Sequence, residues 1–264
     1  MTTAIEQRYS EHTIEVAGLA LRYLKGGAGA PVIVLHHSTG NPGWIPFYER
    51  LAERAIVYVP DMPGYGQSAR PEWAREPRDL AILLLQALTR LGLQTVTVVG
   101  LGLGGFVAAE MATMSQERIR RLVLVGAPGH QPRDGEILDQ MMVDFHEYVM
   151  AGFRDEDGFQ AAFGDDARRR FKELWDYSRE MTARLTWKPY MFSRRLAPLL
   201  REVRTPTLIL HGAEDAIVPV DVAGQYAHAL PNARLEVVPS AGHLVEYEDP
   251  GAVAARIVTF AFES

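Results

Sequence analysis

Short apolar segments alternate with segments of helical spacing along almost the whole of this 264-residue chain. Apolar runs of this length, rich in Val, Ile and Leu, are typical of strands that are buried on both faces of a sheet. They occupy residues 32–35, 55–59, 95–99, 122–125, 207–210 and 235–238, after two extended stretches at 12–16 and 19–24. Helical patterns occupy residues 45–52, 79–91, 106–114, 220–230 and 251–262. Because alternating strands and helices are joined by right-handed crossovers, we predict an α/β fold, with a mostly parallel central sheet flanked by helices on both faces.

The alternation stops between about residues 129 and 204, where no convincing strand occurs. Two stripes of apolar side chains at helical spacing lie in this segment. They consist of Ile137, Leu138, Met141, Met142, Phe145, Tyr148 and Val149, and of Phe171, Leu174, Trp175, Met181 and Leu185. We therefore predict a single core made of residues 1–128 and 205–264, with residues 129–204 forming a helical insertion over the sheet. A sheet of this kind places its chemistry at the carboxyl ends of its strands.

Charge and cysteine content exclude several functional classes. Lys and Arg total 27 against 33 Asp and Glu, a net charge of -6 that gives no basic footprint for nucleic acid. Without Cys, the chain has no disulfide, no thiol nucleophile and no thiolate metal site. No apolar run approaches the roughly 18 residues that a membrane span needs, and the first ten residues lack the apolar part of a signal peptide. We expect a cytoplasmic protein whose partner is a small molecule, with no nucleic acid and no membrane.

The glycine cluster at residues 100–105 follows an expected strand and opens an expected helix, and it allows two interpretations. Read as G-x-G-x-x-G, it matches the dinucleotide-binding fingerprint. That fingerprint also needs an acidic residue about 20 positions on, and the next strand ends Val125-Gly126-Ala127, without a carboxylate. Read as G-x-S-x-G, it matches a nucleophile elbow whose middle residue is Gly102 in place of serine.

The remaining motifs favour the second interpretation. In order, they are Leu35-His36-His37-Ser38, Asp61-Met62-Pro63-Gly64-Tyr65-Gly66-Gln67-Ser68, the glycine cluster, Gly212-Ala213-Glu214-Asp215-Ala216-Ile217-Val218-Pro219 and Gly242-His243. With these five features the chain resembles the α/β-hydrolase family from about residue 20 to residue 262, and the helical insertion falls where that family carries its cap. The order 102, 215, 243 is the order of nucleophile, acid and histidine in this fold.

The resemblance implies a role for each of these residues. His243 would be the catalytic base, and Asp215 would hold its imidazole in the right tautomer. Backbone N–H groups of Ser38 and Leu103 would form the oxyanion hole. His37 stands where the family usually has Gly and adds an imidazole near the site. The family pattern implies no cofactor, and the other His and carboxylate residues show no recognisable metal-ligand spacing.

Gly102 has no side-chain atom that could attack a substrate, and three explanations are open. The natural residue could be serine, replaced to inactivate a hydrolase of ester or carbon–carbon bonds. The chain could instead use the His243–Asp215 base alone, as the resemblance to hydroxynitrile lyases and cofactor-free dioxygenases of this fold implies. It could also be a non-catalytic binding protein on the same fold. A nicotinamide-dependent dehydrogenase is the remaining alternative, carried by the dinucleotide interpretation of the glycines.

Aromatic and methionine side chains are dense in the insertion and favour a small, mainly apolar ester or carbonyl compound as ligand. The residues expected to line its pocket are His37, Met142, Phe145, Trp175 and Trp187. The sequence leaves the identity of the compound and the oligomeric state open.

Overall fold

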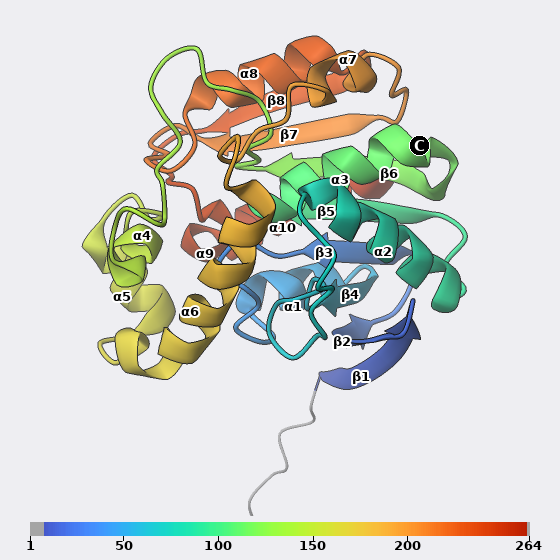
Figure 1. Cartoon of the computed structure of the whole chain (residues 1–264), viewed down its shortest axis with the longest axis horizontal. Coiled ribbons are helices and arrows are strands. Elements are labelled where there is room, and N and C mark those ends of the chain that lie inside the picture. The colour runs from blue at the N-terminus through green and yellow to red at the C-terminus, as the bar shows by residue number, and fades with distance from the viewer. Residues whose placement is uncertain (1–7, 263–264) are drawn as a thin grey trace, which may run out of the picture.

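The apolar runs form one eight-stranded sheet in the computed structural model, which describes residues 8–262 (Figure 1). Its strand order is β1-β2-β4-β3-β5-β6-β7-β8. The strands are β1 (Tyr9–Val16), β2 (Leu19–Gly27), β3 (Pro31–Leu35), β4 (Ile56–Pro60), β5 (Val96–Leu101), β6 (Ile119–Val125), β7 (Thr207–Gly212) and β8 (Ala233–Val238). β2 is antiparallel to both of its neighbours, and all pairs from β4 to β8 are parallel. The predicted fold class is confirmed.

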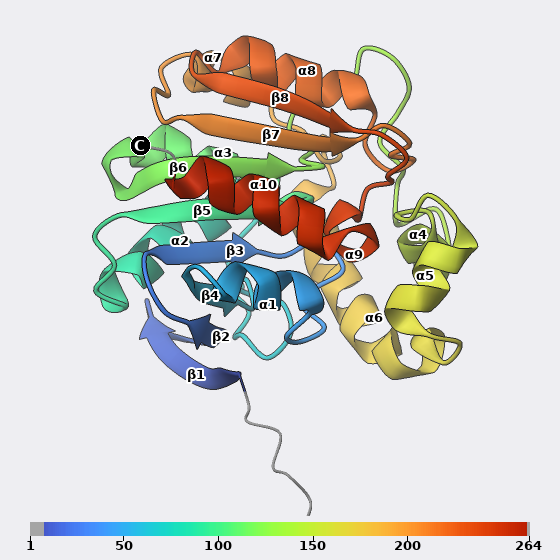
Figure 2. The same ribbon diagram turned by 180° about the vertical axis from the view of Figure 1, so that it is seen from behind.

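Helices cover both faces of the sheet. In Figure 2, α1 (Pro46–Ala52) and α10 (Pro250–Phe262) lie on the face toward the viewer, and their apolar sides join one buried cluster with the strands. On the opposite face, α2 (Pro77–Arg90), α3 (Leu103–Met114) and α8 (Val220–Ala229) pack into a second cluster. Both faces of the central strands are therefore buried, which explains why their sequences are continuously apolar instead of alternating.

A change of crossover direction occurs between β3 and β5, which are neighbours in the sheet. The chain leaves β3 toward α1 on one face and leaves β5 toward α3 on the other face. In an open α/β sheet, this kind of switch point opens a crevice at the carboxyl ends of the two strands. Residues 36–38 follow β3 and Gly102 follows β5, so the topology brings them together.

The segment between β6 and β7 contains α4 (Phe145–Met150), α5 (Glu156–Phe163), α6 (Ala167–Thr186) and α7 (Leu196–Leu200). The first three lie together beyond the carboxyl ends of the strands, as Figures 1 and 2 both show. The second predicted stripe lies on α6. The first stripe was expected to be helical from Ile137 to Val149, and this is wrong, because the helix begins only at Phe145. Asp144 caps the N-terminus of α4, because its side chain accepts a hydrogen bond from the His146 N–H. The exact boundaries 129 and 204 of the insertion stay a prediction.

Two short elements complete the described chain, the 3₁₀ turn at Gln116–Arg118 and α9 (Val245–Glu248). α9 directly follows Gly242 and His243 and packs against α1 and α10. Within residues 8–262, no helix combines the length and the apolar character needed to cross a lipid bilayer.

Candidate active site

Gly102 forms the sharp turn between β5 and α3. Its φ of 49° and ψ of -119° lie in a region that glycine adopts far more easily than residues with a Cβ. Its N–H donates to the Val125 carbonyl at 2.8 Å, which ties the turn to the end of β6. A Cβ on Gly100 would lie 2.5 Å from the Gly104 oxygen, and one on Gly104 would overlap the Leu35 carbonyl. The glycine cluster therefore lets α3 pack directly on the strand ends.

This packing accounts for the glycines without a dinucleotide. The parallel strands, numbered from β3, follow the order 2-1-3-4-5-6 instead of the 3-2-1-4-5-6 order typical of dinucleotide-binding sheets. The strand order therefore gives no support to the dehydrogenase interpretation.

His243 and Asp215 form a buried hydrogen-bonded pair. His243 Nδ1 donates to Asp215 Oδ2 at 2.8 Å, and the two side chains are 6% and 1% exposed. The other carboxylate oxygen, Oδ1, accepts the N–H groups of Ile217 and Val218, both at 2.8 Å. Asp215 is thereby fixed, and it fixes the imidazole with Nε2 free to face Gly102. A Cβ on Gly102 would lie 3.1 Å from this Nε2 atom.

The pairing outweighs burial in setting the charge of both groups. Burial acts to raise the pKa of Asp215, but His243 together with the neighbouring donors brings it below its ordinary value. Burial acts to lower the pKa of His243, and the Asp215 carboxylate nevertheless raises it above its ordinary value. The pair is thus built to hold an imidazole that accepts a proton readily and keeps it close to a carboxylate.

A further histidine contacts Asp215, and sequence reasoning missed it. His211 Nε2 lies 3.2 Å from Asp215 Oδ2 and donates to the Val218 carbonyl at 2.9 Å. Burial lowers the pKa of His211 despite the nearby carboxylate. The only signal in the sequence is its position four residues before Asp215 at the end of a buried strand.

The adjacent histidines after β3 contact different parts of the protein. His36 Nδ1 donates to the His37 carbonyl at 2.7 Å, and His36 Nε2 accepts the Met62 N–H at 3.0 Å. Burial lowers the pKa of His36 to about 4, so it is neutral at neutral pH. Its role is to hold the 61–68 loop against the end of β3.

His37 lies at the turn itself. Its Nδ1 would be closer than 3.0 Å to a Cβ on Gly102, and its ring centroid is 5.0 Å from that of His243. Its Nε2 lies 2.9 Å from Oε1 of Glu246, whose side chain is fully buried. Sequence reasoning missed Glu246, because only the fold brings α9 to the end of β3. The one local hint is a carboxylate three residues after His243.

A cavity of about 10 Å³ adjoins these groups, roughly the volume that one water molecule needs. Ser38, Leu103 and His243 line it from the core. Tyr148 lines it from α4, with its hydroxyl 3.4 Å from Ser38 Oγ, and burial raises the pKa of Tyr148 to about 12. The structure thus brings together the predicted residues 38, 103 and 243 around one small space.

The side chains expected to bind a ligand from the insertion lie in different places. Phe145 and Trp175 pack on each other at 5.6 Å within the aromatic core of the insertion. Met142 is 80% exposed and Trp187 is 69% exposed. None of these four lines the cavity beside His243. Their roles as ligand contacts stay a prediction.

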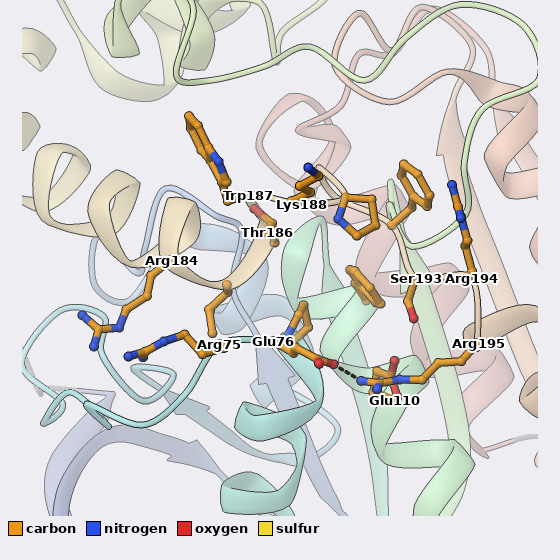
Figure 3. Close-up of a pocket in the computed structure, with 15 residues that line it drawn as sticks. Arg75, Glu76, Glu110, Arg184, Thr186, Trp187, Lys188, Ser193, Arg194 and Arg195 are labelled. Atoms are coloured by element: carbon orange, nitrogen blue, oxygen red, sulfur yellow. Dashed lines mark hydrogen bonds and ion pairs between the residues drawn. The ribbon is translucent and has the colours of Figure 1, made fainter.

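A larger cavity of about 730 Å³ lies where the start of α2, the flank of α3 and the end of α6 meet (Figure 3). Trp187 lies on its wall, and Glu76 forms an ion pair with Arg195 there. Its other charged residues are Arg75, Glu110, Arg184, Lys188 and Arg194. This cavity does not include His243, Asp215 or Gly102, so it is distinct from the small space at the strand ends.

Proteins of known function and known structure resemble this chain over nearly its whole length. A 2-hydroxy-6-oxo-6-(2'-aminophenyl)hexa-2,4-dienoic acid hydrolase of Metapseudomonas resinovorans is 26% identical, over 97% of this chain and 92% of that protein. A 2-hydroxymuconate semialdehyde hydrolase of Pseudomonas sp. (strain CF600) is 27% identical, over 95% and 93%. The solved structure of a meta-cleavage product hydrolase variant from Pseudomonas fluorescens IP01 has a TM-score of 0.79 at 24% identity, covering 94% of this chain and 96% of that one.

The family comparison covers the same region as the motifs. The model of the alpha/beta hydrolase family matches residues 32–256, which span the sheet from β3 onward, the insertion and the segment that carries His243. With this match and the observed strand order, the chain belongs to the alpha/beta hydrolase family.

Proposed function

We propose that this protein is a general-base enzyme that acts on a small, mainly apolar ester or carbonyl compound without a serine nucleophile. The observation that carries the proposal is the position of His243. Its Nδ1 is held by Asp215, while its Nε2 lies 3.1 Å from the point where a Cβ of residue 102 would stand. A free imidazole nitrogen at this point is suited to deprotonating a water molecule or a substrate bound above the turn.

In the proposed hydrolysis, His243 takes a proton from water as the water oxygen attacks the substrate carbonyl. Ser38 and Leu103 border the small cavity. In the proposed step, their backbone N–H groups hydrogen-bond to the oxyanion that develops. The imidazolium then returns the proton to the leaving group. One water molecule is consumed, and His243 ends in the neutral state in which it began. Asp215 stays ionised throughout and stabilises the imidazolium.

The placement of His37 favours a reaction that needs no side chain at residue 102. It is less expected for a serine hydrolase from which the serine has been removed. A side chain at residue 102 would collide with the His37 imidazole, which is held in place by Glu246.

The relatives suggest where to look for a substrate. Those described above hydrolyse 2-hydroxy-6-oxo-dienoic acids and 2-hydroxymuconate semialdehyde, according to their names. A carbonyl compound of that kind, or an ester, presents the group that the proposed oxyanion site would polarise. We infer a hydrolase-type reaction on such a compound, at a carbon–carbon or an ester bond.

The test compares the parent protein with His243→Ala and with His228→Ala, an exposed histidine that serves as control. Hydrolysis of 2-hydroxymuconate semialdehyde and of a series of p-nitrophenyl esters is followed by absorbance. We expect turnover in the parent and the control, and a loss of about 10²–10⁴-fold in His243→Ala. Equal turnover in His243→Ala would overturn the proposal. So would thermal stabilisation of the parent by these compounds or by NAD without any turnover.

A further inference from the structure

A second histidine–carboxylate pair faces the first one across Gly102. His37 Nδ1 and His243 Nε2 both lie around the point that a Cβ on Gly102 would occupy. The far nitrogen of each ring contacts a carboxylate, Glu246 at 2.9 Å and Asp215 at 2.8 Å. Two imidazoles from distant segments of the chain thus converge on one point at the turn, the position of a Cβ on residue 102.

The contacts of His37 fix its tautomer. An ionised Glu246 carboxylate has no proton to donate, so His37 Nε2 must be the donor of this hydrogen bond. His37 Nδ1 then carries a lone pair. This Nδ1 atom is buried and has no hydrogen-bond partner among residues 8–262. A buried imidazole nitrogen without a partner costs free energy, and it keeps that lone pair directed at the turn.

A state in which only one of the two imidazole rings is charged is more favourable than a state in which both are charged. Two adjacent imidazolium ions would repel each other, so the pair can pass a single proton between its rings without both rings being charged at once. Asp215 and Glu246 provide negative charge on the two sides. The other titratable groups near the pair include His36, His211, Tyr148, Tyr48 and Tyr247. His36 and His211 have lowered pKa values because they are buried, so neither competes for the proton at neutral pH.

We propose that His37, oriented by Glu246, is a second catalytic acid–base residue that acts on the same substrate as His243 from the space where a serine hydroxyl would stand. This inference rests on the proposed function, since it assigns His37 to the reaction that His243 begins. The substrate class it fits is a carbonyl compound that must lose a proton at one atom and gain one at another.

The proposed step balances its protons within the pair. His37 starts neutral, with its lone pair on Nδ1, and His243 starts neutral with its lone pair on Nε2. His243 Nε2 takes a proton from water or from an acidic position of the substrate and passes it to His37 Nδ1, directly or through one water molecule. His37 Nδ1 then gives this proton to the carbonyl oxygen or to the carbon that leaves, so both rings end neutral, as they began.

A purely structural role for His37 makes different predictions from a catalytic one. If the His37–Glu246 contact only joined α9 to the end of β3, its loss would change stability and leave the pH dependence of kcat/KM as it was. If His37 transfers protons, its loss removes one limb of that pH profile. An external imidazole that enters the vacated space would also restore part of the rate only in the catalytic case.

The experiment uses the full chain in four forms: parent, His37→Ala, His37→Gln and Glu246→Gln, with His228→Ala as control. kcat/KM is measured from pH 5 to pH 9, with and without added imidazole, on whichever of 2-hydroxymuconate semialdehyde and the p-nitrophenyl esters the parent hydrolyses fastest. We expect a fall of about 10²–10⁴-fold in both His37 variants, the loss of one limb of the pH profile and partial recovery of His37→Ala with imidazole. Glu246→Gln should keep the fold and shift that same limb, which provides the test should His37→Ala fail to fold.

Two results separate this inference from the proposed function. One result is that His37→Gln and Glu246→Gln keep the activity and pH profile of the parent while His243→Ala is inactive. This result overturns the role of His37 and leaves the proposed base function of His243 standing. Full activity in His243→Ala overturns both.

Discussion

The imidazole of His37 fills the space that any side chain on Gly102 would need. The two residues come from the ends of neighbouring strands, β3 and β5, and the switch in crossover direction places them face to face. Glycine at residue 102 and histidine at residue 37 are therefore complementary. A larger residue at the first position requires a different conformation at the second.

Gly102→Ser should destabilise the protein. The substitution forces a side chain into an unfavourable backbone conformation and against His37, at a cost of about 1–3 kcal/mol in free energy of unfolding. Urea denaturation of the parent and the variant measures it. Adding His37→Ala to Gly102→Ser should recover part of the lost stability, because only the steric term is relieved. A serine variant as stable as the parent contradicts this account of the turn.

Asp215→Asn should nearly abolish activity while the protein remains folded. The amide cannot stabilise the imidazolium of His243 and favours the wrong tautomer, a change that lowers kcat by about 10⁴-fold in serine proteases. The neighbouring Glu214→Gln is a matched control, because Glu214 is exposed and lies one residue away. Steady-state kinetics with circular dichroism on both variants gives the answer. Equal losses in the two variants would show that the effect is not specific to the His243 contact.

Glu248→Ala should slow the reaction through the loop that carries His243. One Glu248 oxygen accepts the Gly242 N–H at 2.7 Å and the other accepts the Arg154 N–H at 2.6 Å. Loss of two hydrogen bonds to a carboxylate should cost on the order of 3 kcal/mol of stability and lower kcat more than it changes KM. Glu53→Ala, which removes an exposed ion pair, is expected to change neither. Unchanged kcat in Glu248→Ala would mean that the loop holds its shape without this carboxylate.

The free energy of unfolding should fall as the pH drops from about 6.5 toward 4. Burial lowers the pKa of His36 and of His130 from 6.5 to about 4. In this window the two histidines are protonated in the unfolded chain but stay neutral in the folded chain. Their contribution to the free energy of unfolding is complete above pH 6.5 and is progressively lost as the pH falls, by at most on the order of 3 kcal/mol for each residue. Urea denaturation at several pH values measures the slope. His130→Leu should make the slope shallower, and an unaltered slope in that variant would show that His130 does not contribute.

Much of the sheet was predictable because its physical cause is local. A strand buried on both faces must be apolar at every position, and the run at residues 32–35 shows this without any knowledge of its neighbours. The motif order then predicted that Asp215 and His243 belong together, and the hydrogen bond between them agrees with that pairing. Their catalytic roles stay a proposal.

What could not be predicted depends on contacts between distant segments. Glu246 is one of many acidic residues in the sequence, and only the packing of α9 against the core brings it to His37. The start of α4 was misplaced for a related reason. Residues 137–144 have helical spacing, but they are held in an irregular path by bonds such as that from the Leu138 N–H to the Ile217 carbonyl. Periodicity records which side of a segment is buried, and long-range hydrogen bonds then decide its conformation.

Between Tyr148 on α4 and His243 there is space for little more than one water molecule. Under the proposed function, an organic reactant would reach the imidazole only after Tyr148 and its neighbours on α4 move, and the rate of that movement would set an upper limit on turnover.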